Sequence, residues 1–175
     1  MNDRQLFEAY KERVYLFCRY MLRSQSDAED VCQEVFFKAM TADRSSVQNL
    51  KSWLLRIAAN ECNTLLRRRR NGLNKELLSF MQSRSLQTAT VEETYEQREM
   101  VHSLHLLLDE LPAKVKIAIL LHYSAELTLP ETAEVLRIPV GTVKSRINRG
   151  LKKLKNMLEK QSSEYMKGEN HHASV

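Results

Sequence analysis

The chain has 175 residues and a formal net charge of +5 at pH 7, which suits one domain or two small ones with an anionic partner. It contains only four glycines and three prolines, and this scarcity favours an all-α protein. Its three cysteines are odd in number and widely spaced, which argues for reduced thiols rather than a disulfide framework. We see neither a membrane-length apolar run nor a signal peptide, so we expect a cytoplasmic protein with no membrane insertion.

The positive charge is concentrated in two separated segments. Six basic residues against one acidic residue give residues 51–70 a charge of +5, and eight against one give residues 137–160 a charge of +7. Between them, one basic residue against six acidic ones gives residues 92–110 a charge of −5. Two basic segments predict two contacts along one polyanion.

Three helices are predicted in the N-terminal part of the chain, from apolar residues at helical spacing. They span residues 3–23, 26–40 and 49–70. Ser26 is the predicted N-cap of the second helix, and residues 41–49 form a polar loop. Asn71 and Gly72 are expected to end the third helix.

The rest of the chain is expected to hold a linker, a second helical unit and a tail. Residues 71–91 lack a sustained period and predict a flexible linker. A second helical domain is predicted over residues 92–160, and the polar residues 161–175 predict a disordered tail.

Residues 127–158 predict two helices joined by a tight turn. Thr128 and Glu131 have the spacing of a capping box, and Pro139 stops the first of the two helices. The second helix has one apolar stripe, formed by Val143, Ile147, Leu151, Leu154 and Leu158. Its other side carries Lys, Ser, Asn and Arg, which suits a DNA major groove. The alternative is an ordinary amphipathic hairpin with a solvated basic face.

Two other segments carry polar clusters. Asp30, Gln33 and Glu34 share one face of the second helix, where they form either a solvated surface or a binding surface. Four consecutive arginines at 67–70 either neutralise a helix C-terminus or hold a nucleic-acid backbone. No nearby histidine supports acid–base catalysis, so we do not expect an enzyme.

These segments, taken in order, resemble the extracytoplasmic-function (ECF) group of bacterial sigma factors, of the sigma-70 family. The resemblance is carried by DAEDVCQEVF, by SWLLRIAAN with the basic run that follows it, and by PVGTVKSRINRGLKKL. It implies an all-α protein with two small helical domains joined by a flexible linker. A three-helix domain like sigma region 2 would occupy residues 1–70, and a helix-turn-helix domain like region 4 would occupy residues 92–160.

The resemblance also assigns partners and residues. It implies an alternative sigma factor that binds core RNA polymerase, through the β′ clamp helices and the β subunit, and promoter DNA at two elements. It further implies control by an anti-sigma factor, with no cofactor and no metal.

The polymerase-binding residues would be Asp30, Gln33 and Glu34. Residues 42–48 would form a pocket for a flipped base of the minus-ten element, and the residues on that element would be Trp53, Arg56, Asn60, Arg67 and Arg68. The minus-thirty-five element would meet the helix-turn-helix at about 129–148, through Thr142, Lys144, Ser145, Arg146, Asn148 and Arg149.

Some features depart from the family or leave alternatives open. Arg137 stands where the family often has Gly, which can strain the turn by about 1 kcal/mol. His102, His105 and His122 would need further ligands to hold a metal, so we expect ordinary helix residues. The alternative function is a stand-alone transcriptional regulator that binds duplex DNA as a dimer without polymerase.

Overall fold

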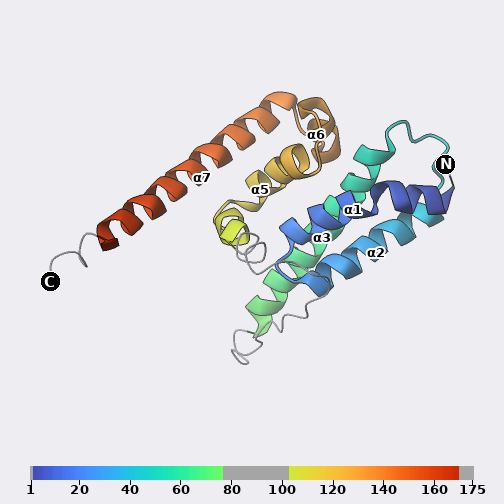
Figure 1. The fold of residues 1–175 in the computed structure, drawn as a ribbon. Coiled ribbons are helices and arrows are strands. Elements are labelled where there is room, and N and C mark those ends of the chain that lie inside the picture. The colour runs from blue at the N-terminus through green and yellow to red at the C-terminus, as the bar shows by residue number, and fades with distance from the viewer. Residues whose placement is uncertain (1, 77–102, 170–175) are drawn as a thin grey trace.

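The protein is helical throughout the part of the chain that its computed structural model describes. That part comprises residues 2–76 and 103–169, with side chains placed in 2–70 and 103–160. Figure 1 shows two groups of helices, α1–α3 and α5–α7, and α6 lies against α3. The predicted all-α class with two helical domains is confirmed.

The N-terminal domain consists of three helices that pack against one another: α1 (Asp3–Met21), α2 (Gln25–Thr41) and α3 (Leu50–Glu76). A capping box formed by Asn2 and Gln5 starts α1. The cap of α2 is Ser24, whose Oγ accepts a hydrogen bond from the Asp27 amide at 3.2 Å. The prediction of Ser26 was therefore wrong, because α2 begins directly after the short turn that follows α1.

The core of this domain is formed by apolar residues from all three helices. Phe17 of α1, Val35 of α2 and Leu54 of α3 are almost completely buried. The three cysteines, Cys18, Cys32 and Cys62, are buried in the same core as free thiols. A hydrogen bond with Cys62 is the main cause that raises the pKa of Cys18, and burial raises the pKa of Cys32 to about 11. Cys18 and Cys32 therefore stay protonated at neutral pH.

Helix α3 continues past its predicted end. It runs through Asn71 and Gly72 to Glu76, so residues 71–76 are helical where a linker was expected. One internal glycine costs a helix only about 1 kcal/mol relative to alanine, and a helix of 27 residues tolerates that cost. The remainder of the predicted linker, residues 77–91, lies outside the described residues.

The C-terminal domain begins, in the described part, with helical residues 103–109. It continues with α5 (Ala113–Ile119), the π-helical turn η1 (Leu120–Ser124), α6 (Leu129–Leu136) and α7 (Val140–Glu169). The prediction of a disordered tail was wrong for residues 161–169, which extend α7 because no proline interrupts them. In Figure 1 this end of α7 extends away from the other helices. Within the described residues, no helix is both long and apolar enough to span a membrane.

Candidate nucleic-acid interface

The helix-turn-helix forms as its sequence predicts. Thr128 Oγ1 accepts from the Glu131 amide at 3.3 Å, and Glu131 Oε2 accepts from the Thr128 amide at 2.8 Å. This capping box starts α6, and the backbone hydrogen bonds to Thr128 lower the pKa of Glu131. Arg137 ends α6 in the left-handed conformation, with φ 53° and ψ 49°. The strain expected where the family often has glycine is therefore real.

The apolar stripe of α7 is buried over only its first two turns. Val143 and Ile147 are buried against the rest of the domain. Leu151 is 39% exposed and Leu158 is 49% exposed, so the prediction of one continuous buried stripe was wrong. Leu154 is half-buried and packs against the core, and beyond it α7 extends past the helices that cover its start.

A close approach of helices holds the start of α7 in place. Gly150 lies against α5, where a Cβ atom would stand 2.4 Å from Ile119 Cδ1 and 2.6 Å from Val115 Cγ1. Only glycine fits this crossing without displacing those side chains. The crossing fixes the direction of α7 directly after Arg149, the last of the polar residues expected to meet DNA.

The polar residues at the start of α7 lie on its uncovered side. Lys144, Ser145, Asn148 and Arg149 are exposed, while Thr142 and Arg146 are half-buried. Arg149 folds back along the helix, where its Nε donates to the Ser145 carbonyl at 3.2 Å and its Nη2 to Ser145 Oγ at 3.3 Å. Ser145 Oγ in turn donates to the Thr142 carbonyl at 3.0 Å. The guanidinium is thus partly oriented before any ligand arrives.

A cavity of about 370 Å³ lies at the N-terminal end of α3. It is lined by Asp43, Ser46, Val47, Gln48, Asn49, Ser52, Trp53, Arg56, Glu134 and Val135. Two of the five residues predicted for the minus-ten element, Trp53 and Arg56, lie in this lining. The other three, Asn60, Arg67 and Arg68, are exposed further along α3 and do not line it.

Four lining residues were missed by the sequence prediction: Asn49, Ser52, Glu134 and Val135. Asn49 caps α3, since its Oδ1 accepts from the Ser52 amide at 3.0 Å. Ser52 is 3% exposed, and its Oγ has no hydrogen-bond partner among the described residues. The sequence carried one indication: Asn49 stands at the predicted start of a helix, where polar side chains gather at the positive end of the helix dipole.

The predicted polymerase-binding residues form an exposed polar face on α2. Asp30, Gln33 and Glu34 are all exposed. Lys38 Nζ bridges this face to α3, at 2.8 Å from Glu61 Oε1 and 3.1 Å from Glu34 Oε1. The hydrogen bond with Glu61 is the main cause that raises the pKa of Lys38.

An apolar residue that the sequence prediction missed stands on the same helix. Phe37 is 64% exposed, one turn after Gln33 and Glu34. The adjacent pair Phe36–Phe37 could have indicated it. Neighbouring helix positions point in different directions, so a helix covered on one side buries only one of the two. Phe36 is 2% exposed.

One residue of the arginine run has a structural partner. Arg69 forms two parallel contacts of 2.6 Å with the Asp27 carboxylate at the start of α2. Arg67, Arg68 and Arg70 are exposed. The run therefore combines a helix-to-helix ion pair with a free basic surface.

The described histidines have neighbours of their own. His122 Nδ1 lies 2.6 Å from the Leu127 carbonyl, and His105 Nδ1 lies 3.4 Å from Arg19 Nη1. His102 lies outside the described residues. Within the described ranges, no group of three His, Cys, Asp or Glu side chains is arranged to hold a metal ion.

Family models match both helical domains. The model for sigma-70 region 2 matches residues 6–72, and the model for sigma-70 region 4 matches residues 102–154. The ECF RNA polymerase sigma factor SigW of Bacillus subtilis is 33% identical over 162 residues, which cover 87% of each chain. The ECF sigma-E factor of Haemophilus influenzae is 30% identical over 164 residues, 88% of this chain and 86% of that one.

The two matched domains define a sigma-70-type transcription factor with a DNA-binding helix-turn-helix. The chain belongs to the ECF group of this family, which acts in transcription initiation and has no catalytic activity of its own.

Solved structures share the fold. RpoE of Bartonella quintana, in complex with the anti-sigma factor NepR, has a TM-score of 0.68 and 23% identity, and covers 89% of this chain and 96% of its own. CnrH in complex with the cytosolic domain of CnrY has a TM-score of 0.67 and 22% identity, with 90% and 87% coverage. At these identities the likeness concerns the fold alone.

Proposed function

We propose that this ECF sigma factor uses the three surfaces described above to bind three different partners: polymerase and the two promoter elements. The exposed α2 face, with Asp30, Gln33 and Glu34, binds the clamp helices of core RNA polymerase. The cavity at the start of α3 receives a base of the opened minus-ten element. The polar face of α7 reads the minus-thirty-five element in the major groove. The N-terminal domain thus covers about residues 1–70, and the helix-turn-helix domain about 92–160.

The observation that carries this proposal is the separation of the surfaces. The acidic α2 face lies on a different helix from the cavity, and the cavity combines polar groups with the aromatic side chain of Trp53. An unstacked base can be read on its pairing edge and stacked on an aromatic ring, so this lining suits it. For the upstream contact, α7 offers exposed Lys, Ser, Asn and Arg side chains on a helix held by buried residues on its other side.

The polymerase-binding assignment is tested by charge reversal on α2. We expect the double variant Asp30→Lys/Glu34→Lys to lose pull-down of core polymerase while circular dichroism shows an unchanged helix content. Glu12→Lys, an exposed reversal on α1, is the matched control. Full retention of polymerase by the double variant would refute the assignment.

An anti-sigma factor is the proposed regulatory partner. One solved neighbour of the fold, RpoE of Bartonella quintana, is in complex with the anti-sigma factor NepR. A protein that covers both the α2 face and the cavity would block polymerase and DNA together. Competition between such a protein and core polymerase for the purified chain tests this partner.

A stand-alone regulator is the competing function. It predicts tight binding to a two-fold-related duplex site without polymerase. The sigma factor predicts promoter-specific transcripts only when core enzyme is added. Run-off transcription on a library of genomic fragments distinguishes the two, and the absence of specific initiation with core enzyme would overturn the sigma role.

A further inference from the structure

An exposed aromatic residue stands in the middle of the polar face on α2. Phe37 follows Asp30 by seven residues, which is almost two helical turns. It follows Gln33 by four residues and Glu34 by three. Residues at these separations share one side of a helix, so the phenyl ring lies among the three polar side chains. It is 64% exposed, the highest value among the large apolar residues of the described ranges.

The position of this ring, rather than its exposure, makes it informative. Single apolar side chains are common on protein surfaces, and exposure alone would mean little. The neighbouring Phe36 is buried and meets the Phe7 ring of α1 edge-on, with 4.9 Å between the ring centroids. Phe37 lies on the other side of α2, where α1 and α3, the helices that pack against α2, leave it uncovered. The domain therefore does not bury this ring, and its burial requires a partner.

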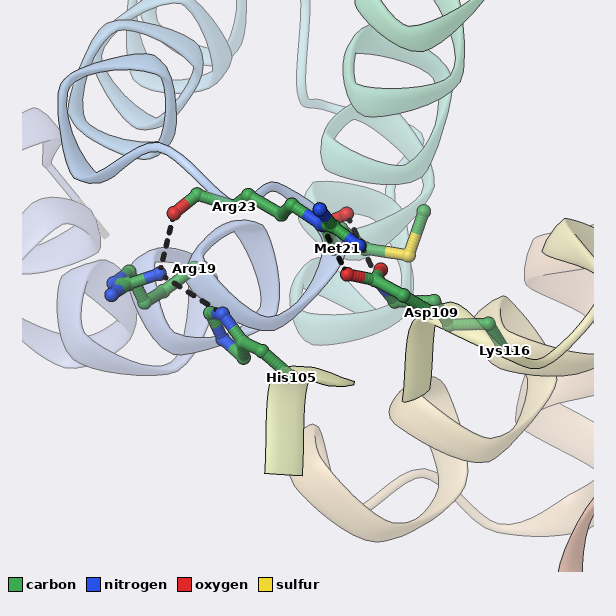
Figure 2. A network of polar contacts seen from close by, with 6 residues as sticks. All are labelled: Arg19, Met21, Arg23, His105, Asp109 and Lys116. Atoms are coloured by element: carbon green, nitrogen blue, oxygen red, sulfur yellow. Dashed lines mark hydrogen bonds and ion pairs between the residues drawn. The ribbon is translucent and has the colours of Figure 1, made fainter. Parts of the chain in front are cut away.

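The contacts between the two domains lie elsewhere and leave the α2 face exposed. Lys116 of α5 donates to Asp109 Oδ1 at 2.8 Å, and Arg23, in the turn after α1, forms an ion pair with the same carboxylate (Figure 2). At the start of α3, Asn49 Nδ2 donates to Glu131 Oε1 of α6 at 2.9 Å. In Figure 1, α2 lies on the side of the N-terminal domain away from α5–α7. A partner can therefore reach the α2 face while the domains are in contact.

The two carboxylates beside Phe37 differ in how far their charge is compensated. Glu34 Oε1 lies 3.1 Å from Lys38 Nζ, which also lies 2.8 Å from Glu61 Oε1 of α3. Asp30 forms no ion pair with any described residue. The uncompensated negative charge of the face is therefore concentrated on Asp30. A partner that fits this face offers an apolar recess for the ring and a basic group beside the recess.

We propose that Phe37 is the main energetic anchor of polymerase binding, filling an apolar recess flanked by basic groups on the clamp helices, while Asp30 speeds the approach. The proposal rests on the proposed function of the α2 face. Aromatic side chains near the centre of an interface, shielded from water by a polar ring, carry most of the binding free energy. Charges at the rim act mainly on the association rate, because they attract the partner before contact.

The kinetics of core polymerase binding to the immobilised full chain test this assignment of roles. Phe37→Ala should weaken the affinity about 30-fold, as truncation of an interface hot spot does. The loss should appear almost entirely as faster dissociation, and the salt dependence of association should not change. Phe37→Leu keeps an apolar side chain and should recover part of the affinity. Asp30→Asn should instead slow association and reduce its salt dependence.

A matched control separates the anchor from a general loss of apolar surface. Leu16→Ala removes an apolar side chain that is 37% exposed on α1, outside every proposed binding surface. It should change neither rate constant. Alanine favours a helix more than phenylalanine or leucine does, so circular dichroism should show an unchanged helix content in both alanine variants.

The anchor and the proposed function fail on different results. A loss of less than about tenfold in Phe37→Ala would overturn the anchor, as would a loss that appears as slower association. The anchor alone would fall if Asp30→Lys/Glu34→Lys abolished polymerase binding while Phe37→Ala retained it. Retention of polymerase by that double reversal would instead overturn the assignment of the whole α2 face.

Discussion

Gly150 sets a steric constraint on the helix expected to read DNA, and replacing it with alanine tests the packing directly. Alanine favours a helix by about 1 kcal/mol over glycine. Its Cβ would, however, lie 2.4 Å from Ile119 Cδ1 and 2.6 Å from Val115 Cγ1. The end of Ile119 can move, but the β-branched Val115 is stiff in a helix, and overpacking costs about 1–3 kcal/mol. We expect Gly150→Ala to destabilise the C-terminal domain by about 1 kcal/mol.

The readout must report on that domain alone. Trp53, the single tryptophan, lies in the N-terminal domain, so its fluorescence is an internal control rather than the assay. Amide hydrogen exchange in α5 and α7 measures the local opening free energy. A gain in protection equal to the full helix propensity of alanine would refute the close approach.

A compensating substitution sharpens this test. Ile119→Val removes the Cδ1 atom nearest to the new methyl group, and by itself should cost about 1 kcal/mol. In the double variant with Gly150→Ala, the two losses should partly cancel, with a coupling of about 1 kcal/mol. Additive losses would mean that the two side chains do not meet.

Three further predictions follow from the helix caps, the recognition face and the interdomain contact. Arg149→Ala should weaken discrimination between specific and scrambled upstream duplexes by about 1–3 kcal/mol, measured by fluorescence anisotropy, whereas a uniform loss would identify a phosphate contact. Thr128→Ala should lower the exchange protection of α6 by about 1 kcal/mol, and unchanged protection would show the cap to be dispensable. The lowered pKa of Asp109 stabilises the packed state above the ordinary aspartate pKa of about 4, and this contribution disappears as pH falls below that value. The stability difference between wild type and Asp109→Asn should therefore shrink below about pH 4, and a difference that persists there would contradict the role of its charge.

Local patterns predicted the helices and their caps well where the deciding interactions are close in sequence. The capping box of Thr128 and Glu131 formed, and Arg137 adopted the left-handed turn expected of a glycine position. The same local logic could not choose between Ser24 and Ser26, because either serine can cap a helix. Local patterns also failed to predict where α3 ends, because Gly72 weakens a helix but does not stop it.

The sequence could not predict burial and contacts that depend on which helices pack against one another. Periodicity placed Leu151 and Leu158 on the apolar side of α7, but burial requires a neighbouring helix, and α7 extends beyond its neighbours. The same limit applies to Asn49, whose contact with Glu131 joins residues 82 positions apart. The acidic segment around Asp109 was visible in the sequence, but not its position against Arg23.

The buried cysteines have a practical consequence for measuring how the domains move. Cys18, Cys32 and Cys62 all lie in the core of the N-terminal domain, away from solvent. Maleimides react with accessible thiolates, and the thiols of these three residues are buried. A cysteine introduced on the surface of each domain can therefore be labelled with a fluorophore while the native thiols stay in place. Single-molecule energy transfer can then follow the distance between the domains during promoter binding, in a protein whose core is unchanged.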